Sequence, residues 1–194
     1  MIKNIAIVYK TGGDFDLEYP YRLVKSIREN CSRDVGIYCL SDDPDVSYFC
    51  NHILLKRNLL GWWSKLELFD NFANCLYFDL DTIIRGNIDS LLDHPHKFTM
   101  LHDFSIHDRP ASGIMAWKGD YRGISRSFRM KDALVYTTPE KWGDQGYISE
   151  RIKTPDFFQN IFPGMIGSFK QENTDCPIVC FHGNPRPHKV DWKV

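Results

Sequence analysis

Residues 75–81 read Cys75-Leu76-Tyr77-Phe78-Asp79-Leu80-Asp81, four apolar residues followed by an Asp-Leu-Asp triplet. An unbroken apolar run of this kind is typical of a strand buried on both faces, as in the middle of a parallel sheet. Strand-like runs alternate with helical patterns on both sides of it along the chain. This alternation predicts an α/β fold in which a mainly parallel central sheet is flanked by helices.

Apolar runs and apolar residues at four-residue spacing place the individual elements. The expected strands are Ile2 to Tyr9, Val35 to Leu40, His52 to Leu55, Cys75 to Asp81, Phe98 to His102, Ser112 to Trp117 and Ile178 to His182. One helix is expected to end near Asn30, and Ser64-Lys65-Leu66-Glu67 fits a capping box that would begin another. Further helices are expected near Ile88 to Leu92, Tyr121 to Met130 and Gln145 to Ile152.

Composition narrows the class of protein. The chain has 194 residues, with 24 Lys+Arg against 25 Asp+Glu, and 14% aromatic residues, so it can bury a core and carries no basic field for nucleic acid or anionic membranes. Its apolar runs are far shorter than the roughly 18–20 residues of a transmembrane helix, and no signal peptide is apparent. We therefore expect one cytoplasmic domain, residues 1–194, with six reduced cysteines.

Asp79 and Asp81 are two residues apart at the end of the apolar strand, so their side chains project toward the same face. Two carboxylates that converge repel each other unless a cation neutralises them, and hard oxygen ligands suit Mg²⁺ or Mn²⁺. The alternative is that these acidic residues only cap a loop. An Asp-x-Asp triplet alone does not separate the two interpretations.

His182 follows the last apolar strand and precedes Gly183-Asn184-Pro185-Arg186-Pro187-His188-Lys189. If that strand lies in the same sheet, His182 opens onto the same edge as the aspartates and supplies an imidazole nitrogen, a ligand that Mn²⁺ accepts. Arg186 and Lys189 would then face a diphosphate, Arg186 through its bidentate fork. The alternative is a proline-rich tail with solvated charges on the surface.

Three other polar positions stand out. Lys65 falls in the first turn of an expected helix, where a cation opposes the helix dipole unless a bound phosphate compensates; a solvated lysine is the alternative. Gly143-Asp144-Gln145-Gly146 places an acid and an amide on a turn, where they can hold sugar hydroxyls or where Asp144 can cap a helix. Asp103 ends the strand from Phe98 to His102 and adds a carboxylate to the same edge.

Together these segments resemble a known family. Tyr77-Phe78-Asp79-Leu80-Asp81-Thr82, Ile88-Asp89-Ser90-Leu91, Ser112-Gly113-Ile114-Met115, Gly143-Asp144-Gln145-Gly146 and the terminal Phe181-His182-Gly183-Asn184-Pro185-Arg186-Pro187 look like GT-A fold glycosyltransferases, in particular the glycogenin and galactosyltransferase-like (family 8-like) group. They occur in that family's order and span nearly the whole chain. The resemblance implies a single GT-A (Rossmann-like) domain.

The resemblance also implies a function. It implies a hexosyltransferase that moves a hexose from a nucleotide-diphospho-sugar, with UDP favoured, to an acceptor hydroxyl on a glycan, lipid or protein, with retention favoured. A Mn²⁺ or Mg²⁺ ion would be held by Asp79, Asp81 and His182. Donor contacts would come from Tyr9, Thr11, Lys65, Asp79, Ser112, Gly113 and Arg186. Asp144 and Gln145 would lie near the reacting centre, and Asp144 or Asp103 could act as a base in an inverting enzyme.

Two other functions use the same motif. Phe78-Asp79-Leu80-Asp81-Thr82 also resembles the nucleophile strand of haloacid-dehalogenase-like phosphatases, in which Asp79 would attack phosphorus and Asp81 would act as the acid. That family usually has glycine where Thr82 stands, and no later acidic pair supplies its Mg²⁺ site. A non-catalytic nucleotide-sugar binding protein would keep the metal motif without turnover.

Overall fold

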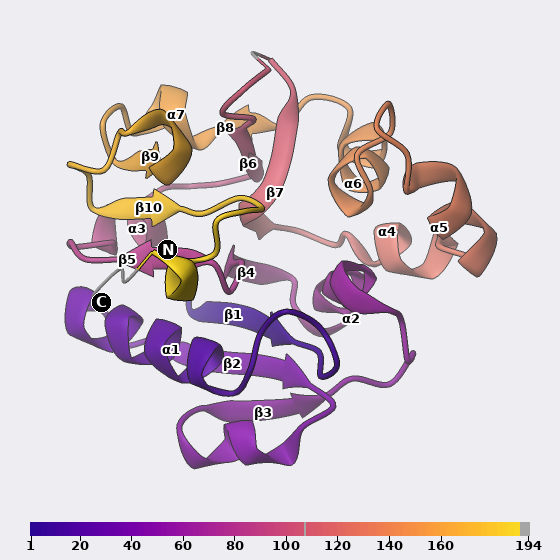
Figure 1. Ribbon diagram of the computed structural model, residues 1–194, viewed down its shortest axis with the longest axis horizontal. Coiled ribbons are helices and arrows are strands. Elements are labelled where there is room, and N and C mark those ends of the chain that lie inside the picture. The colour runs from indigo at the N-terminus through magenta and orange to yellow at the C-terminus, as the bar shows by residue number, and fades with distance from the viewer. Residues whose placement is uncertain (107, 191–194) are drawn as a thin grey trace.

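The computed structural model describes residues 1–106 and 108–190. Its central sheet has seven strands in the order β3-β2-β1-β4-β7-β6-β8 (Figure 1). These are β1 (Asn4–Tyr9), β2 (Gly36–Ser41), β3 (Asn51–Leu54), β4 (Asn74–Phe78), β6 (Phe98–His102), β7 (Pro110–Lys118) and β8 (Asp156–Phe157). A second sheet has the order β5-β10-β9, formed by β5 (Thr82–Ile84), β10 (Ile178–Cys180) and β9 (Ile166–Ser168).

Most pairings in the central sheet are parallel, as predicted. β1 pairs in parallel with β2 and with β4, β2 with β3, and β6 with β8. The exception is β7, which lies antiparallel between β4 and β6. A parallel neighbour requires a long crossover, whereas β7 follows β6 after a short loop and therefore runs back beside it.

Helices cover both faces of the sheet. The α-helices are α1 (Glu18–Asn30), α2 (Leu68–Asn71), α3 (Asp89–Asp93), α4 (Arg122–Ser127), α5 (Met130–Tyr136), α6 (Asp144–Ile152) and α7 (Phe158–Ile161), and the 3-10 helices are η1 (Pro44–Tyr48), η2 (Gly61–Glu67), η3 (Phe169–Gln171) and η4 (Pro187–Lys189). In Figure 1, α4, α5 and α6 lie together at one end of the molecule, away from α1 and the small sheet. None of the helices in the described part of the chain is long and apolar enough to cross a bilayer.

The core around the central sheet has two parts because strand side chains alternate, and a smaller cluster of Ile83, Cys176, Val179 and Phe181 packs at the second sheet. Ile5 and Ile7 of β1 pack with Leu23 and Val24 of α1 on one face. Ala6, between them, belongs to the other face, where Phe69, Trp117 and Tyr147 are among the buried residues. β4 alternates likewise, with Leu76 and Phe78 on the first face and Tyr77 on the second. The apolar run before Asp79 is therefore buried on both faces, as its sequence predicts.

Three local expectations are corrected. Ser64 and Glu67 do not form a capping box: Ser64 Oγ donates to the Leu59 carbonyl, and Glu67 accepts from the amides of Lys56 and Arg57 at 2.8 and 3.0 Å. The Glu67 carboxylate therefore binds the amides of Lys56 and Arg57, and not the amide of Ser64 that a capping box would use. Residues 121–130 are also not one helix, because α4 ends at an extended, buried Phe128 and α5 begins anew.

The third correction concerns β10, which pairs with β5 and β9 and not with the central sheet. β5 (Thr82–Ile84) directly follows the Asp-Leu-Asp triplet and pairs with β10, the middle strand of the small sheet. The amide of Phe181 also donates to the Asp81 carbonyl at 3.0 Å. The small sheet therefore brings the C-terminal segment to the aspartates. His182 reaches the same edge although its strand is not part of the central sheet.

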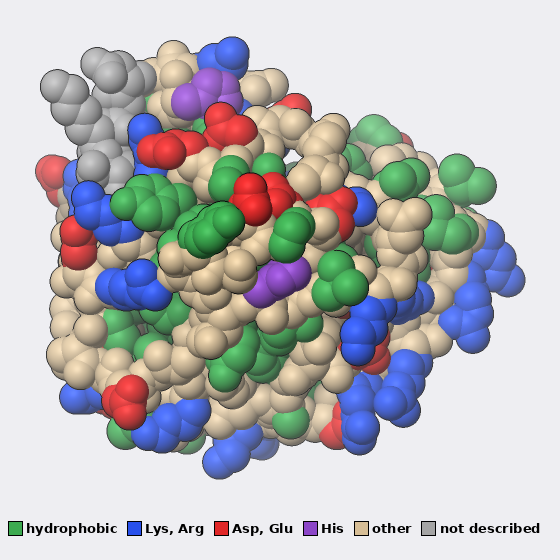
Figure 2. Space-filling model, turned by 90° about the horizontal axis from the view of Figure 1, so that it is seen from below, with side chains coloured by type: hydrophobic (Ala, Val, Ile, Leu, Met, Phe, Trp, Pro, Cys, Tyr) green, Lys and Arg blue, Asp and Glu red, His purple; other side chains and the backbone are tan. Residues whose placement is uncertain are grey.

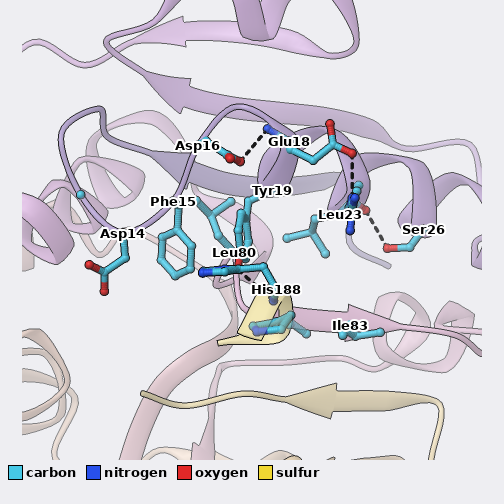
Figure 3. Close-up of a pocket in the computed structure, with 14 residues that line it drawn as sticks. Asp14, Phe15, Asp16, Glu18, Tyr19, Leu23, Ser26, Leu80, Ile83 and His188 are labelled. Atoms are coloured by element: carbon cyan, nitrogen blue, oxygen red, sulfur yellow. Dashed lines mark hydrogen bonds and ion pairs between the residues drawn. The ribbon is translucent and has the colours of Figure 1, made fainter. Parts of the chain in front are cut away.

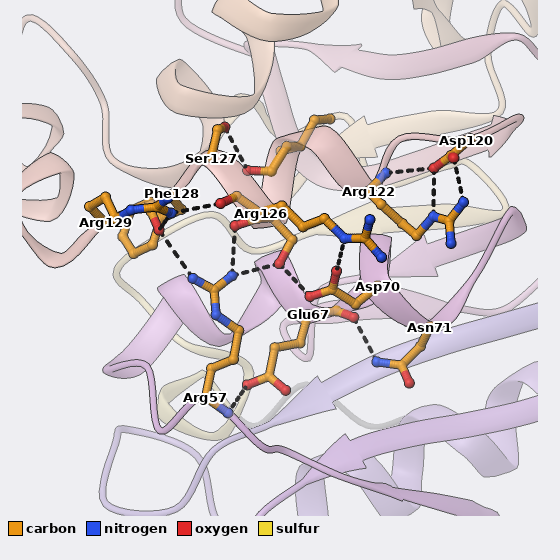
Figure 4. Close-up of polar contacts among 12 residues, drawn as sticks. Arg57, Glu67, Asp70, Asn71, Asp120, Arg122, Arg126, Ser127, Phe128 and Arg129 are labelled. Carbon is orange, nitrogen blue, oxygen red and sulfur yellow. Dashed lines mark hydrogen bonds and ion pairs between the residues drawn. The ribbon is translucent and has the colours of Figure 1, made fainter.

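Polar contacts join α4 to α2 and to Arg57, in the loop between β3 and η2 (Figure 4). Arg57 donates to the Ser125 carbonyl at 2.7 Å, and Ser125 Oγ donates to Asp70 at 2.6 Å. Lys and Arg side chains gather along the right-hand edge of the molecule in Figure 2, the side on which α4 and α5 lie in Figure 1. All six cysteines are free, as expected, and four of them are buried.

Candidate active site

A cleft of about 600 Å³ opens where β1 and β4 end. Loops after parallel strands meet at this edge of an α/β sheet, which is where such folds bind ligands. The cleft is lined by ten of the residues that the sequence singles out: Lys65, Asp79, Asp81, Asp103, Ser112, Gly113, Asp144, Gln145, His182 and Arg186. Residues separated by more than 100 positions therefore share one site.

Lys65 lies at the centre of a buried polar group. Its ammonium is 2.9 Å from Asp144 Oδ2, 3.0 Å from Asp79 Oδ1 and 3.1 Å from Ser112 Oγ. Burial alone would lower the pKa of Lys65, but the two carboxylates raise it above its ordinary value, so the side chain stays charged. Lys65 lies near the end of η2, so the prediction that it falls in the first turn of a helix is wrong. Its charge is balanced by the carboxylates of Asp79 and Asp144, where a bound phosphate was the expected partner.

Ser112 and Asp144 complete this group from β7 and α6. Ser112 Oγ donates to Asp144 Oδ2 at 2.7 Å, and both side chains are buried. α6 begins at Asp144 and its N-cap is Gly143, so Asp144 does not cap the helix. Its carboxylate bonds to Ser112 and Lys65 instead. Gln145, next to it, is half-buried and lines the cleft.

The two carboxylates of the Asp-Leu-Asp triplet have different partners. Asp79 contacts Lys65 and accepts from the Tyr77 hydroxyl, whereas Asp81 pairs with Arg186. Burial, and then repulsion from Asp79, raises the pKa of Asp81 to about 7, against the attraction of Arg186. Burial likewise raises the pKa of Asp79, and Asp144 adds to the effect while Lys65 opposes it. Three carboxylates, Asp79, Asp81 and Asp144, therefore share two cations, Lys65 and Arg186.

Arg186 is held over the cleft by three contacts. One arm of its guanidinium pairs with Asp81, the other lies 3.3 Å from Asp14 Oδ2, and the plane stands 4.7 Å from the centre of the Phe15 ring. Asp14 and Phe15 belong to the loop after β1. Arg186 therefore lies on the site, whereas Lys189 is exposed and does not line the cleft, so its expected contact with a diphosphate stays a prediction.

His182 and the aspartates do not form a metal centre in this arrangement. His182 Nε2 lies 2.7 Å from Ser168 Oγ, and its ring stacks on Phe104 at 5.0 Å. Burial lowers the pKa of His182 and favours the neutral imidazole that ligates metals. Across residues 1–106 and 108–190, however, no three His, Cys, Asp or Glu side chains are grouped so as to hold a metal. The chemistry of Asp79 and Asp81 fits a hard cation, while His182 is bonded elsewhere.

Asp103 is engaged by its own loop. Its Oδ1 accepts from the amides of Ser105 and Ile106 at 2.7 and 3.0 Å, and its Oδ2 accepts from Arg109 Nε at 2.8 Å. Burial would raise the pKa of Asp103, but these donors hold it below the ordinary value. Asp103 therefore lies at the edge of the cleft as a carboxylate whose negative charge is balanced by Arg109.

Tyr9 and Thr11 lie outside the cleft lining. β1 alternates, so Val8 lines the cleft with Lys10 while Tyr9 is buried in the core. Thr11 Oγ1 donates to Asp42 Oδ2 at 2.8 Å. Nucleotide contacts from Tyr9 and Thr11 stay a prediction, and the residues of this segment that line the cleft are Val8 of β1 and Lys10 just after it.

Comparisons with known proteins complete the description. No protein-family model and no curated protein sequence matches the chain. Solved structures match well: the glycosyltransferase GlyE of Streptococcus pneumoniae at a TM-score of 0.69 and 12% identity, and the galactosyltransferase LgtC, with donor and acceptor sugar analogues, at 0.63 and 11%. The chain has a GT-A fold. The bifunctional glycosyltransferase WbbM matches at 0.61 and 10%.

The extent of these matches differs. The structural match covers 97% of this chain with GlyE, 95% with LgtC and 98% with WbbM. The chain spans 88% of the LgtC chain, but only about half of the others, 56% of GlyE and 47% of WbbM. The likeness therefore concerns one domain of the larger proteins and nearly the whole of LgtC.

A second cavity of about 390 Å³ adjoins the cleft in this GT-A fold (Figure 3). It lies between α1, the turn that joins β4 to β5, and η4, and it shares Asp14, Phe15 and Leu80 with the cleft. Tyr19 and His188 hydrogen-bond across it. This contact fastens the C-terminal segment that carries Arg186 to α1.

Several residues of the cleft were not predicted from the sequence. They are Val8, Leu101, Phe104 and Arg109. The sequence does point to Lys10, Asp14 and Phe15, because they belong to the Gly-Gly loop after the first strand, and such loops carry ligand contacts. From the sequence, Trp62 is either core or rim packing or a sugar-stacking surface. Arg109 has no signal, because a lone arginine in a loop occurs in most proteins.

Proposed function

We propose that this protein is a glycosyltransferase that takes a hexose from a nucleotide-diphospho-sugar, with UDP as the favoured nucleotide, and passes it to an acceptor hydroxyl. The observation that carries the proposal is the composition of the cleft. It brings two cations, Lys65 and Arg186, together with Asp79, Asp81 and the Asp144-Gln145 pair at the ligand-binding edge of the sheet. The GT-A fold, seen in glycosyltransferases such as LgtC and GlyE, supports it.

The chemistry requires charge to be stabilised at the leaving group. As the bond from the sugar to the diphosphate breaks, negative charge grows on the phosphate oxygens, and preorganised cations lower that barrier. Arg186 has a planar fork suited to phosphate, and Lys65 is a charged neighbour of the donor site. Donor contacts from Ser112 and Gly113, which lie beside Asp79 and Lys65, belong to the same proposal.

We propose that a Mn²⁺ or Mg²⁺ ion binds at Asp79 and Asp81. When bound, the ion would stabilise the charge of the departing diphosphate as a Lewis acid. Asp79 and Asp81 lie together in the cleft, and burial and their mutual repulsion raise the pKa of Asp81, so a bound cation would favour the ionised form. Arg186 has to turn from Asp81 toward the phosphates to make room. His182 would join only after leaving Ser168.

We further propose that transfer retains the anomeric configuration, with Asp144 and Gln145 at the reacting centre. One solved structure similar to this chain is an active-site mutant of LgtC in which a glutamine is replaced by glutamate. Gln145 is the glutamine that lines the cleft here, beside Asp144. The Asp144 carboxylate already contacts Lys65 and accepts from the Ser112 hydroxyl. We therefore assign Asp144 first to positioning these two side chains.

The first test is nucleotide binding. UDP, GDP, CDP and ADP are added to the protein with Mn²⁺, Mg²⁺ or chelator, and the unfolding temperature is recorded. A ligand at about 100 times its dissociation constant stabilises by about 2.7 kcal/mol, which corresponds to roughly 5–10 °C for a chain of this length. A metal-dependent shift for UDP alone supports the proposal. No shift with any pair contradicts it.

The second test is turnover. Asp81→Asn should abolish release of UDP from UDP-hexoses and abolish the metal-dependent shift, while Asp93→Asn, whose partner Arg33 lies away from the cleft, should change neither. Product anomers read by NMR decide between retention and inversion. Hydrolysis of phosphate monoesters without nucleotide binding would indicate the phosphatase, and binding without turnover would indicate the non-catalytic protein. We expect the enzyme to work in the cytoplasm, where free thiols persist.

A further inference from the structure

Trp62 and Trp63 are neighbours in η2 with opposite environments. Trp63 is 5% exposed and stacks on Phe128 with ring centres 4.8 Å apart. Trp62 is 55% exposed and lines the cleft. Adjacent residues of a 3-10 helix point about 120° apart, so one indole enters the core and the other does not. Because Trp62 is exposed where it lines the cleft, its indole is free to contact a molecule bound there.

The indole of Trp62 lies against the start of α6. A Cβ built on Gly143 would stand 3.1 Å from Trp62 Nε1, closer than ordinary packing, and Gly143 has a φ of +69°. The absence of a side chain at this position therefore leaves room for the ring. Gly143 directly precedes Asp144 and Gln145. Trp62 is thus an exposed aromatic surface beside the proposed reacting centre.

Planar polar groups face the same cleft. Gln145 offers an amide, and Asp103 and Arg109 form a carboxylate-guanidinium pair at its edge. Arg109 is fixed further by the Trp142 ring, 4.5 Å from its guanidinium carbon. A pyranose has an apolar face of C–H groups and a rim of hydroxyls that both donate and accept. An aromatic face with planar amide, carboxylate and guanidinium groups around it matches both features.

We propose that Trp62 is the stacking platform for the acceptor and that the acceptor is a saccharide, whose apolar face packs on the indole while its reacting hydroxyl points to Asp144 and Gln145. This inference rests on the proposed function of the cleft. It assigns the acceptor side of the site, since Lys65, Asp79, Asp81 and Arg186 supply the charges on the donor side. An alkyl chain could pack on the ring but would leave the polar groups around it without hydrogen-bond partners.

The test begins with direct binding. Wild-type protein saturated with UDP and Mn²⁺ is applied to a glycan array, and dissociation constants of the bound glycans are measured by saturation-transfer NMR. Trp62→Ala should weaken glycan binding about tenfold or more, and Trp62→Phe should restore part of it because the ring is kept. Leu60→Ala is the matched control, since Leu60 is 66% exposed in the same turn but does not line the cleft.

Kinetics separate the acceptor from the donor side. Trp62→Ala should raise the KM for the glycan about tenfold and leave the KM for the UDP-sugar and the unfolding temperature unchanged. Equal glycan affinity in Trp62→Ala and wild type overturns the inference, as does an array without a bound glycan when UDP binds normally. A rise confined to the donor KM overturns it as well. If UDP itself does not bind, the proposed function fails first, and the two failures are therefore distinct.

Discussion

Replacing Lys65 by methionine tests whether the cation holds the site together. Its ammonium contacts two carboxylates at 2.9 and 3.0 Å, and the lysine side chain is only 5% exposed. At about 3 Å each contact is worth about 5 kcal/mol at an effective dielectric constant of 20, before desolvation is subtracted. Asp144 is 11% exposed, while Asp79 is 33% exposed and screened by water, so Asp144 contributes more.

Removing one partner of a buried ion pair costs about 3–5 kcal/mol, because the other charge is left unpaired. We therefore expect Lys65→Met to lose about 3–5 kcal/mol of unfolding free energy, which corresponds to roughly 6–20 °C for a chain of this length. Urea unfolding at pH 7.5, with thermal unfolding beside it, measures the loss. Lys56→Met, at an exposed lysine, should change stability by less than about 0.5 kcal/mol.

A double variant sharpens the test. Adding Asp144→Asn to Lys65→Met removes the more buried of the two carboxylates that lose their cation, so the double variant should lose less stability than the sum of the two single losses. If Lys65→Met loses less than about 1 kcal/mol, or if the two losses simply add, the buried charge network is not what stabilises this site.

Three further predictions concern a buried histidine, two glycines and Arg186. His96 is buried and its pKa is lowered to about 4, first by burial, so the folded state binds fewer protons than the unfolded state. Stability should be complete above pH 6.5 and fall by about 3 kcal/mol toward pH 4, and His96→Gln should flatten that pH dependence of urea unfolding. Gly146→Ala should cost about 3 kcal/mol or more, since its Cβ would lie 1.7 Å from the Lys141 carbonyl oxygen, whereas Gly123→Ala, with open space in α4, should gain up to about 1 kcal/mol in the same assay. Arg186→Gln should weaken UDP binding about tenfold by calorimetry, with Arg186→Lys intermediate, and equal affinity in all three proteins would contradict a phosphate contact.

Local pattern was enough for most of the elements. The apolar run before Asp79 and the alternation of strands with helical patterns led to the mainly parallel sheet, and these features depend only on neighbours along the chain. The pattern failed at Ser64 and Glu67, where a local capping box lost to partners at Leu59, Lys56 and Arg57. It also failed at Phe128, where burial of one side chain ended a helix early.

The candidate site divides in the same way. The chemistry of Asp79 and Asp81 can be predicted from residue type and spacing, since two carboxylates on one side of a strand end favour a bound cation wherever the strand lies. The side chains that pair with these carboxylates cannot be predicted in this way. Lys65 and Arg186 reach them across 14 and 105 positions, and such contacts depend on which strands become neighbours.

The sequence by itself determined the class of fold, the position of the Asp-Leu-Asp triplet at a strand end and the residue types available for a sugar-nucleotide site. These properties follow from hydrophobic periodicity and side-chain chemistry, which act over a few residues. Only the tertiary structure decided that β10 joins a separate sheet, that Asp79 and Asp144 share one buried lysine, and that Trp62 faces the cleft while Trp63 enters the core. Those outcomes depend on long-range packing, because each one requires that distant segments compete for the same space and the same charges.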